Sequence, residues 1–407
     1  MSDHRIVMMH PIESTSATGY ALAGVLALSL ISDVFSREQD PSVTPTTGPR
    51  VEVVGFDLSV SNGTLAYLDH ERLVLIEDGP VPRTVNPDEI AFLTVDGPDD
   101  SITRTPSPSY SGRIWLTDGS YYSTEPVVRR DSLIWKNDLV GRISASLDEI
   151  VAFNASSIDF PASSPDDDLV VLENGDRIEG LIDGVDRNIR VEQVDETEID
   201  IPLERVSSFT LINEESPSSG ARLWSSDGDR IALESYRYEE GLGLIFGDQR
   251  IHVPALPGRV TAFTHDVDRL IPLADQPVRT LAIEGTLRYH NPPPTSEVGI
   301  WPIDAAPMLL SGPIRLEWDL PKPDLGLIAS AVLPPAFQRH GSVELIISDE
   351  TGELFRSVLT RDQPTCDIRI RIRGRRLVME LHENGDGPLQ DSIRLQQAIL
   401  VDAPITD

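Results

Sequence analysis

Residues 169–175 of the chain read Leu-Val-Val-Leu-Glu-Asn-Gly, a short apolar run that ends in an Asn-Gly dipeptide. Asn-Gly and Asp-Gly are the strongest short hairpin signals, because both turn residues adopt positive φ angles easily. Residues 113–119 and 221–228 follow the same plan and end in Asp-Gly. These stretches predict three units that each begin with a strand, a tight turn and a second strand.

The units also end alike. Their closing strands carry Phe153, Phe209 and Phe263, which follow the turn glycines by 34, 34 and 35 residues. A degenerate fourth copy runs from Asn62-Gly63 to Phe92, a separation of 29 residues. A fixed period of this kind predicts repeated domains, and we expect the phenylalanines to fill their cores rather than contact a ligand. The predicted repeats span residues 51–96, 112–155, 168–212 and 220–265. Ser-, Pro- and Asp-rich linkers would separate them, so we expect independent domains in a row.

The third repeat resembles the first half of an Sm-like barrel. From Val170 it shows that family's strand, its turn at Asn174-Gly175, its kink at Gly180 and its strand bearing an asparagine, Asn188. The resemblance implies tandem small barrels of the Sm-like or SH3-like kind. Sm-like barrels often form rings that bind RNA, but residues 165–215 hold 16 acidic and four basic residues. We therefore carry over the fold and not the RNA-binding function.

The pattern changes to longer strands from about Val278. Apolar alternation recurs over residues 312–320, 325–333, 342–347 and 354–359, and residues 367–381 read as a hairpin around Gly374. About eight strands within residues 278–403 predict a two-sheet antiparallel β-sandwich of the jelly-roll type. The predicted fold class is therefore all-β, with tandem small barrels followed by a sandwich.

The end of the chain resembles the NPCBM family. Residues 377–400 show that family's strand, its Gly- and Asp-rich loop, an aspartate (Asp391) and a closing strand with an alanine (Ala398), and residues 342–355 fit its middle. NPCBM domains are galactose-binding-like jelly-roll modules found on glycan-active proteins, so the resemblance implies a carbohydrate ligand. An aromatic residue usually follows the loop aspartate, and this chain has Ile393 and Leu395 instead.

Two groups of residues are candidates for binding a glycan. Tyr289, His290 and Trp301 offer flat faces for sugar rings, although Trp301 is equally compatible with a packed position, and Trp318 reads as core. Arg369, Arg371 and Arg373 alternate with isoleucines, which places the three arginines on one face of one strand. Such a stripe would bind a sulfated or carboxylated glycan through bidentate hydrogen bonds from the guanidinium groups. The plainer interpretation is a charged edge or solvent face that blocks strand pairing, or arginines that pair with neighbouring glutamates.

Metal and catalytic signals are sparse. Glu383, Asp386 and Asp391 form an oxygen-rich loop that is a candidate for a structural Ca²⁺, with a solvated turn as the alternative. The eight histidines show no metal-binding spacing, the single Cys366 has no evident partner, and neither a serine elbow nor a phosphate-binding loop is present. We therefore predict that the chain is not an enzyme.

The amino terminus and the charge bear on location and partners. Residues 20–31 are an uncharged apolar run of 12, which suits a signal-peptide core and is too short for a stable membrane span. This predicts a leader at 1–36 and a linker at 37–50, with a buried helix or short anchor as the alternative. The formal charge of -32 argues against nucleic acid as a partner. Two functions remain: an exported carbohydrate-binding protein, or a periplasmic or cell-surface scaffold that binds proteins through its barrels.

Overall fold

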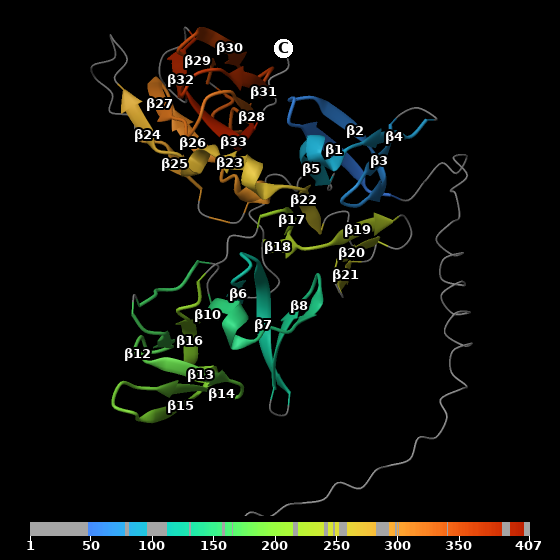
Figure 1. Cartoon of the computed structure of the whole chain (residues 1–407). Helices are drawn as coiled ribbons and strands as arrows, with labels where there is room; N and C mark the ends of the chain where they lie inside the picture. The colour runs from blue at the N-terminus through green and yellow to red at the C-terminus, as the bar shows by residue number, and fades with distance from the viewer. Residues whose placement is uncertain are drawn as a thin grey trace, which may run out of the picture. The chain divides into compact units, whose positions relative to one another are not determined.

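A computed structural model describes most of the chain beyond the amino-terminal segment (Figure 1). The predicted leader and the residues Tyr289, His290 and Asp386 lie outside the described part. No helix in that part is long and apolar enough to cross a membrane. The described residues are 48–77, 81–95, 112–129, 132–156, 159–164, 166–214, 219–239, 243–246, 249–251, 259–281, 293–297, 299, 301–339, 341–384 and 391–402.

The described residues form strands and short 3-10 turns and no α-helix, which confirms the predicted all-β class. Four consecutive segments repeat one antiparallel meander, in which the last strand returns to pair with the first. The second strand is continuous in the first two segments and split in the others, at Gly180 in the third. We call these segments repeats 1 to 4. Repeat 1 comprises β1 Arg50–Gly55, β2 Val60–Leu68, β3 Leu73–Ile76, β4 Arg83–Val85, the turn η1 Pro87–Glu89 and β5 Ile90–Val95.

The other repeats follow the same order. Repeat 2 comprises β6 Gly112–Leu116, β7 Tyr121–Arg129, β8 Ser132–Asn137, β9 Gly141–Ile143, η3 Leu147–Glu149 and β10 Ile150–Asn154. Repeat 3 comprises β11 Leu169–Leu172, β12 Arg177–Glu179, β13 Leu181–Val185, β14 Asn188–Glu192, β15 Glu198–Pro202, η4 Leu203–Arg205 and β16 Val206–Thr210. Repeat 4 comprises β17 Ala221–Ser225, β18 Arg230–Leu233, β19 Tyr236–Glu239, β20 Gly243–Phe246, β21 Gln249–Ile251 and β22 Val260–Thr264.

The first turn of each repeat depends on one residue with a positive φ. In repeats 2, 3 and 4 this residue is Gly119, Gly175 or Gly228, with φ between 78° and 87°, as the Asp-Gly and Asn-Gly dipeptides predict. In repeat 1 the prediction was wrong, because Asn62-Gly63 lies inside β2. The turn there lies at Asp57-Leu58-Ser59, and Leu58 takes the positive φ of 71°.

The repeats are not independent domains, because strands of different repeats pair with each other. The closing strand β5 of repeat 1 pairs with β22 of repeat 4, and β10 of repeat 2 pairs with β16 of repeat 3. In the second pair Phe153 lies directly opposite Phe209, with ring centroids 5.6 Å apart. The four closing phenylalanines are at most 3% exposed, so their prediction as core residues is confirmed. One apolar cluster runs through all four repeats, because pairing buries the closing strands between neighbours.

The carboxy-terminal region is an antiparallel sandwich of two sheets around one apolar core (Figure 1). Trp318 is fully buried in that core, which confirms its interpretation as a packing residue. The first sheet has the order β24 Val278–Leu281, β27 Ile314–Asp319, β32 Arg376–Glu383, β29 Val343–Asp349 and β30 Gly352–Leu359. The second has the order β25 Thr295–Ser296, β26 Met308–Ser311, β33 Ser392–Asp402, β28 Leu325–Val332 and β31 Thr365–Ile372, and β23 Leu270–Pro272 also pairs with β33. Three further 3-10 turns are η6 Val267–Arg269, η7 Leu273–Asp275 and η8 Pro302–Asp304.

The predicted hairpin around Gly374 is wrong, because its two strands belong to opposite sheets. β31 pairs with β28, whereas β32 pairs with β27 and β29. The chain crosses the core at Gly374, where one carboxylate oxygen of Asp349 accepts hydrogen bonds from the N–H groups of Arg373 (2.9 Å) and Gly374 (3.4 Å). Both strands keep their apolar faces inward, so the alternation alone does not distinguish a corner from a hairpin.

The sandwich packs against repeats 1 and 4. A separate apolar cluster joins Phe56 and Phe92 of repeat 1 and Trp224 of repeat 4 to Ile328 and Ile399 of the sandwich. These two sandwich residues belong to β28 and β33, in the middle of the second sheet. The repeats therefore cover the outer face of that sheet around Ile328 and Ile399, whereas Ser330 and Val332 of β28 stay partly exposed on the same face.

Candidate functional site

Arg369 and Arg371 of the predicted stripe lie on β31, the edge strand of the second sheet, and Arg373 follows directly after the strand ends at Ile372. Ile368, Ile370 and Ile372 are buried, while the arginines between and after them point away from the core. Arg369 and Arg373 are exposed and Arg371 is half-buried. The ion pair of Arg369 with Asp367 is loose, with 3.7 Å between nitrogen and oxygen. Successive positions on one face of a strand are about 6.7 Å apart, so the guanidinium groups form an extended row.

The middle of this row borders repeat 1. Arg371 lies opposite Gly326 in the β28–β31 ladder. A Cβ atom added to Gly326 would come within 2.6 Å of the Leu58 side chain, so repeat 1 packs directly over this position. The arginine row thus follows the line where the sandwich meets the repeats, which leaves its two ends more accessible than its centre.

Trp301 is a packed residue in this structure. Its indole is 7% exposed, and its N–H donates to the backbone oxygen of Glu297 at 3.2 Å. The Arg394 guanidinium lies over the ring, 5.4 Å from its centroid, and also forms an ion pair with the Glu297 side chain. A stacked sugar needs an open aromatic face, and the packing around Trp301 does not provide one.

The structure describes two of the three predicted calcium ligands, Glu383 and Asp391, so the calcium site stays a prediction. Glu383 is exposed at the end of β32, and Asp391 is 2% exposed before β33, where its backbone oxygen accepts from the Gly312 N–H. Asp386 lies outside the described residues. Within the described part, no three His, Cys, Asp or Glu side chains are placed to hold a metal ion.

One chain of polar contacts resembles catalytic machinery but joins two repeats. The Tyr236 hydroxyl lies 2.6 Å from Nδ1 of His265, and Nε2 of that ring lies 3.4 Å from a carboxylate oxygen of Asp88. Tyr236 is 6% exposed, and burial raises the pKa of its hydroxyl well above the usual range. A phenol that is so hard to ionise is a poor nucleophile, and we interpret the chain as a link between repeats 4 and 1.

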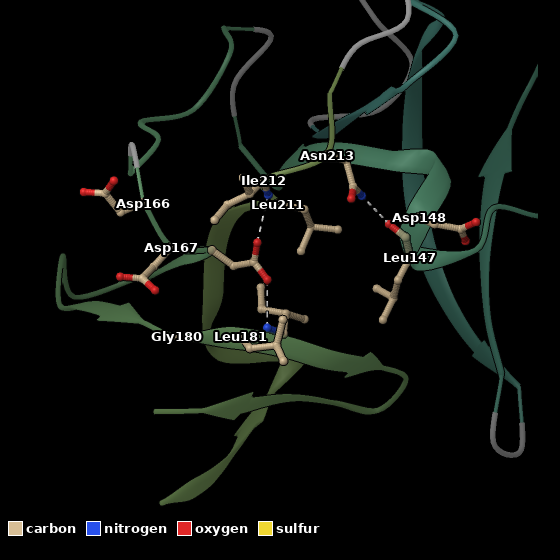
Figure 2. A pocket seen from close by; sticks show the side chains of 11 residues that line it. Leu147, Asp148, Asp166, Asp167, Gly180, Leu181, Leu211, Ile212 and Asn213 are labelled. Carbon is tan, nitrogen blue, oxygen red and sulfur yellow. Dashed lines mark hydrogen bonds between the residues drawn. The ribbon is translucent and has the colours of Figure 1, made fainter. Parts of the chain in front are cut away.

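A cavity of about 410 Å³ lies between repeats 2 and 3, where sequence reasoning predicted only a linker (Figure 2). Repeat 2 contributes Leu147 and Asp148 from η3. The segment around Asp168, the start of β13 and the chain that follows β16 contribute the rest. The residues around the cavity are Leu147, Asp148, Asp166, Asp167, Asp168, Gly180, Leu181, Ile182, Leu211, Ile212 and Asn213.

Asp168 and Asn213 fix the walls of this cavity. The buried carboxylate of Asp168 accepts hydrogen bonds from the N–H groups of Ile182 and Ile212, each at 2.8 Å. The Asn213 amide donates to the backbone oxygens of Leu147 and Ile150, each at 2.6 Å. The Asp168 bonds hold segments of repeat 3 together, and the Asn213 bonds join the segment after β16 to η3 and β10 of repeat 2. The cavity is therefore built into the fold.

The sequence carried one signal for this cavity. Asp166, Asp167 and Asp168 form a run of three acids that looks like part of a solvated linker. The third of them is 7% exposed and holds backbone groups of two strands. A buried, hydrogen-bonded acid in such a run cannot be told from its exposed neighbours by composition alone.

Comparisons with known proteins identify carbohydrate-binding modules of the CBM51 kind among solved structures. A CBM51 from Clostridium perfringens GH95, solved in complex with methyl-galactose, is 15% identical with a TM-score of 0.22, and the match covers 24% of this chain and 70% of that chain. The CBM51-2 and INT domains of Clostridium perfringens ZmpB are 10% identical with a TM-score of 0.23, covering 65% of this chain and 46% of that one. The chain thus spans about half of the ZmpB structure.

Tandem CBM51 modules of a family 98 glycoside hydrolase from Streptococcus pneumoniae are 9% identical with a TM-score of 0.24, and the match covers 86% of this chain and 88% of that one. No protein-family model and no curated protein matches the chain. Identities of 15% or less and TM-scores of 0.24 or less do not assign a family to this chain.

Proposed function

We propose that this chain is an exported, non-catalytic carbohydrate-binding protein whose carboxy-terminal sandwich binds an anionic glycan. The observation that carries this proposal is the sequence of Arg369 and Arg371 on an edge strand of the sandwich, with Arg373 directly after it. In a chain with a formal charge of -32, a local row of arginines stands out as a place where an anionic ligand would be attracted rather than repelled. Guanidinium groups bind sulfate and carboxylate in a forked geometry, and a row of them suits a polymer with repeated negative charges.

The resemblance of residues 377–400 to NPCBM modules supports the same ligand class. The arginine row replaces the aromatic platform that the sequence lacks after Asp391. In this proposal the four repeats are small barrels of the Sm-like kind. The return of each closing strand to its first strand supports that assignment.

The test is a glycan array probed with the chain from residue 45 onward, because the sandwich buries apolar surface against the repeats and is best kept with them. The expected ligands are sulfated or uronic-acid polysaccharides, bound more weakly as salt rises. The variant R369Q/R373Q should lose most of this binding, about tenfold or more. Arg361→Gln, which alters an exposed arginine in the preceding turn, is the matched control and should bind as the wild type does. Binding of neutral glycans alone, or equal binding by both variants, would contradict the assignment.

A second function, that of a protein-binding scaffold, is favoured by a different observation. The repeats share one buried apolar cluster and pair strand to strand, which makes them one connected array rather than separate units on flexible tethers. If no class of glycan binds, this is the function that the structure supports next.

A further inference from the structure

The cavity between repeats 2 and 3 has an apolar interior that is open to solvent. Leu181 is 59% exposed and Ile212 is 54% exposed. Among the described residues only six large apolar side chains are exposed to a comparable degree, and two of these six border this one cavity. Exposed apolar side chains that gather at a concave site mark a place where a partner binds, because their burial is favourable.

The charge around the cavity has one sign. None of its eleven residues is basic, and Figure 2 shows Asp166 and Asp167 on one side and Asp148 on the other, with Leu181, Leu211 and Ile212 between them. Hydrogen bonding from the Ser146 side chain lowers the pKa of Asp148, which keeps its carboxylate ionised in mildly acidic solution. An occupant that combines an apolar group with positive charge would therefore match both features of the site.

The cavity does not need to be assembled on binding. The β10–β16 pairing and the bonds of Asp168 and Asn213 hold both walls in place. A preformed site loses little conformational entropy when it is filled, so even a short segment can bind with measurable affinity.

We propose that this cavity binds a peptide or protein segment that carries arginine or lysine next to a leucine-sized apolar side chain. The apolar side chain covers Leu181 and Ile212, and the cationic groups pair with Asp148 on one rim and Asp167 on the other. The same acids repel the sulfated or carboxylated glycan proposed for the sandwich. The chain therefore has two recognition sites of opposite charge preference, one on the repeats and one on the sandwich.

The test uses three fluorescein-labelled pentapeptide amides, Ala-Arg-Leu-Arg-Ala, Ala-Gln-Leu-Gln-Ala and Ala-Glu-Leu-Glu-Ala, titrated with the chain and followed by fluorescence anisotropy at physiological salt. The arginine peptide should bind at least about fivefold more tightly than the glutamine peptide, and the glutamate peptide should not bind. The variants D148N/D167N and Leu181→Ser should each weaken the arginine peptide by about fivefold or more.

Two matched controls separate this site from the general attraction of an acidic chain for a basic peptide. Asp200→Asn removes an exposed acid on β15 of the same repeat, and Val194→Ser removes an apolar side chain that is 93% exposed in the neighbouring turn. Both should leave the affinity unchanged. Equal losses in the control and cavity variants would overturn the proposal, and so would equal affinity for the arginine and glutamine peptides.

Sedimentation velocity addresses the other occupant, a second copy of the chain. If the wild type self-associates and Leu181→Ser abolishes this while the peptides do not bind, the cavity is a self-association surface and the peptide proposal fails. The test is independent of the glycan array, because none of its variants changes the sandwich.

Discussion

Leu58 has a positive φ at the turn position where the other three repeats have a glycine. Its φ of 71° costs a leucine roughly 1 kcal/mol or more relative to a glycine. The contact that offsets this cost lies in the sandwich, where the leucine side chain packs over Gly326. With Leu58 taken as the turn residue, Phe92 follows it by 34 residues, as in repeats 2 and 3. Repeat 1 is thus regular in spacing and differs from the other repeats because its turn residue also contacts the sandwich.

We predict that Gly326→Ala is destabilising only while Leu58 is present. The new methyl group would lie 2.6 Å from the leucine Cδ2 and 3.0 Å from a Val401 methyl group, which forces a shift. In urea unfolding, Gly326→Ala should lower the free energy of unfolding by about 1–2 kcal/mol in the wild-type background. In a Leu58→Ala background it should lower it by less than about half of that. Equal costs in both backgrounds would mean that the two residues do not interact.

Features that depend on neighbouring residues in the sequence could be predicted, whereas features that depend on contacts between distant residues could not. The turn glycines, the buried phenylalanines and the outward face of Arg369 follow from short-range pattern and were predicted correctly. Leu58 was missed because only a partner 268 residues away explains it. The burial of Trp301 likewise depends on Arg394. The cavity was missed because Asp168 looks like its linker neighbours until its strand partners are known.

At the scale of elements, the turn from β31 to β32 decides that the carboxy-terminal region is a sandwich rather than a longer single sheet. Asp349 holds this corner from the end of β29. One oxygen accepts from the N–H groups of Arg373 and Gly374, and the other from the N–H and hydroxyl of Thr351. Although burial by itself raises the pKa of this carboxyl, these hydrogen bonds outweigh it and lower the pKa.

We predict that Asp349→Asn destabilises the chain by about 1–2 kcal/mol at pH 7. Because the folded-state pKa is lowered, the stabilisation is complete above the unfolded-state pKa near 4 and is lost as pH falls through the folded value. The difference in unfolding free energy between wild type and variant should therefore shrink below about pH 4. Asp362→Asn, in the exposed turn before β31, should show no such difference at any pH.

At the scale of the whole described chain, Asp304 of the sandwich joins two repeats to it. One carboxylate oxygen accepts from the Tyr121 hydroxyl of repeat 2 and the Trp224 N–H of repeat 4, both at 3.2 Å. The other accepts from the Arg230 guanidinium at 3.0 Å, and that guanidinium also lies over the Tyr121 ring. The aspartate itself has a φ of 53°, a conformation that Asp and Asn tolerate better than most residues.

We predict that Asp304→Ala weakens the attachment of the sandwich to the repeats by about 2 kcal/mol, because three donors lose their acceptor in a half-buried site. Thermal unfolding followed by tryptophan fluorescence should show a lower midpoint, since Trp224 reports directly on the site. Asp324→Ala provides the control: this aspartate has a similar φ of 57° in the turn before β28, so its loss changes the backbone preference without these bonds. If both variants unfold alike, the cost comes from the backbone and Asp304 does not join the sandwich to the repeats. If only Asp304→Ala unfolds at a lower temperature, its carboxylate joins the sandwich, with its arginine row, to repeats 2 and 4. Repeat 2 in turn forms one wall of the acidic cavity.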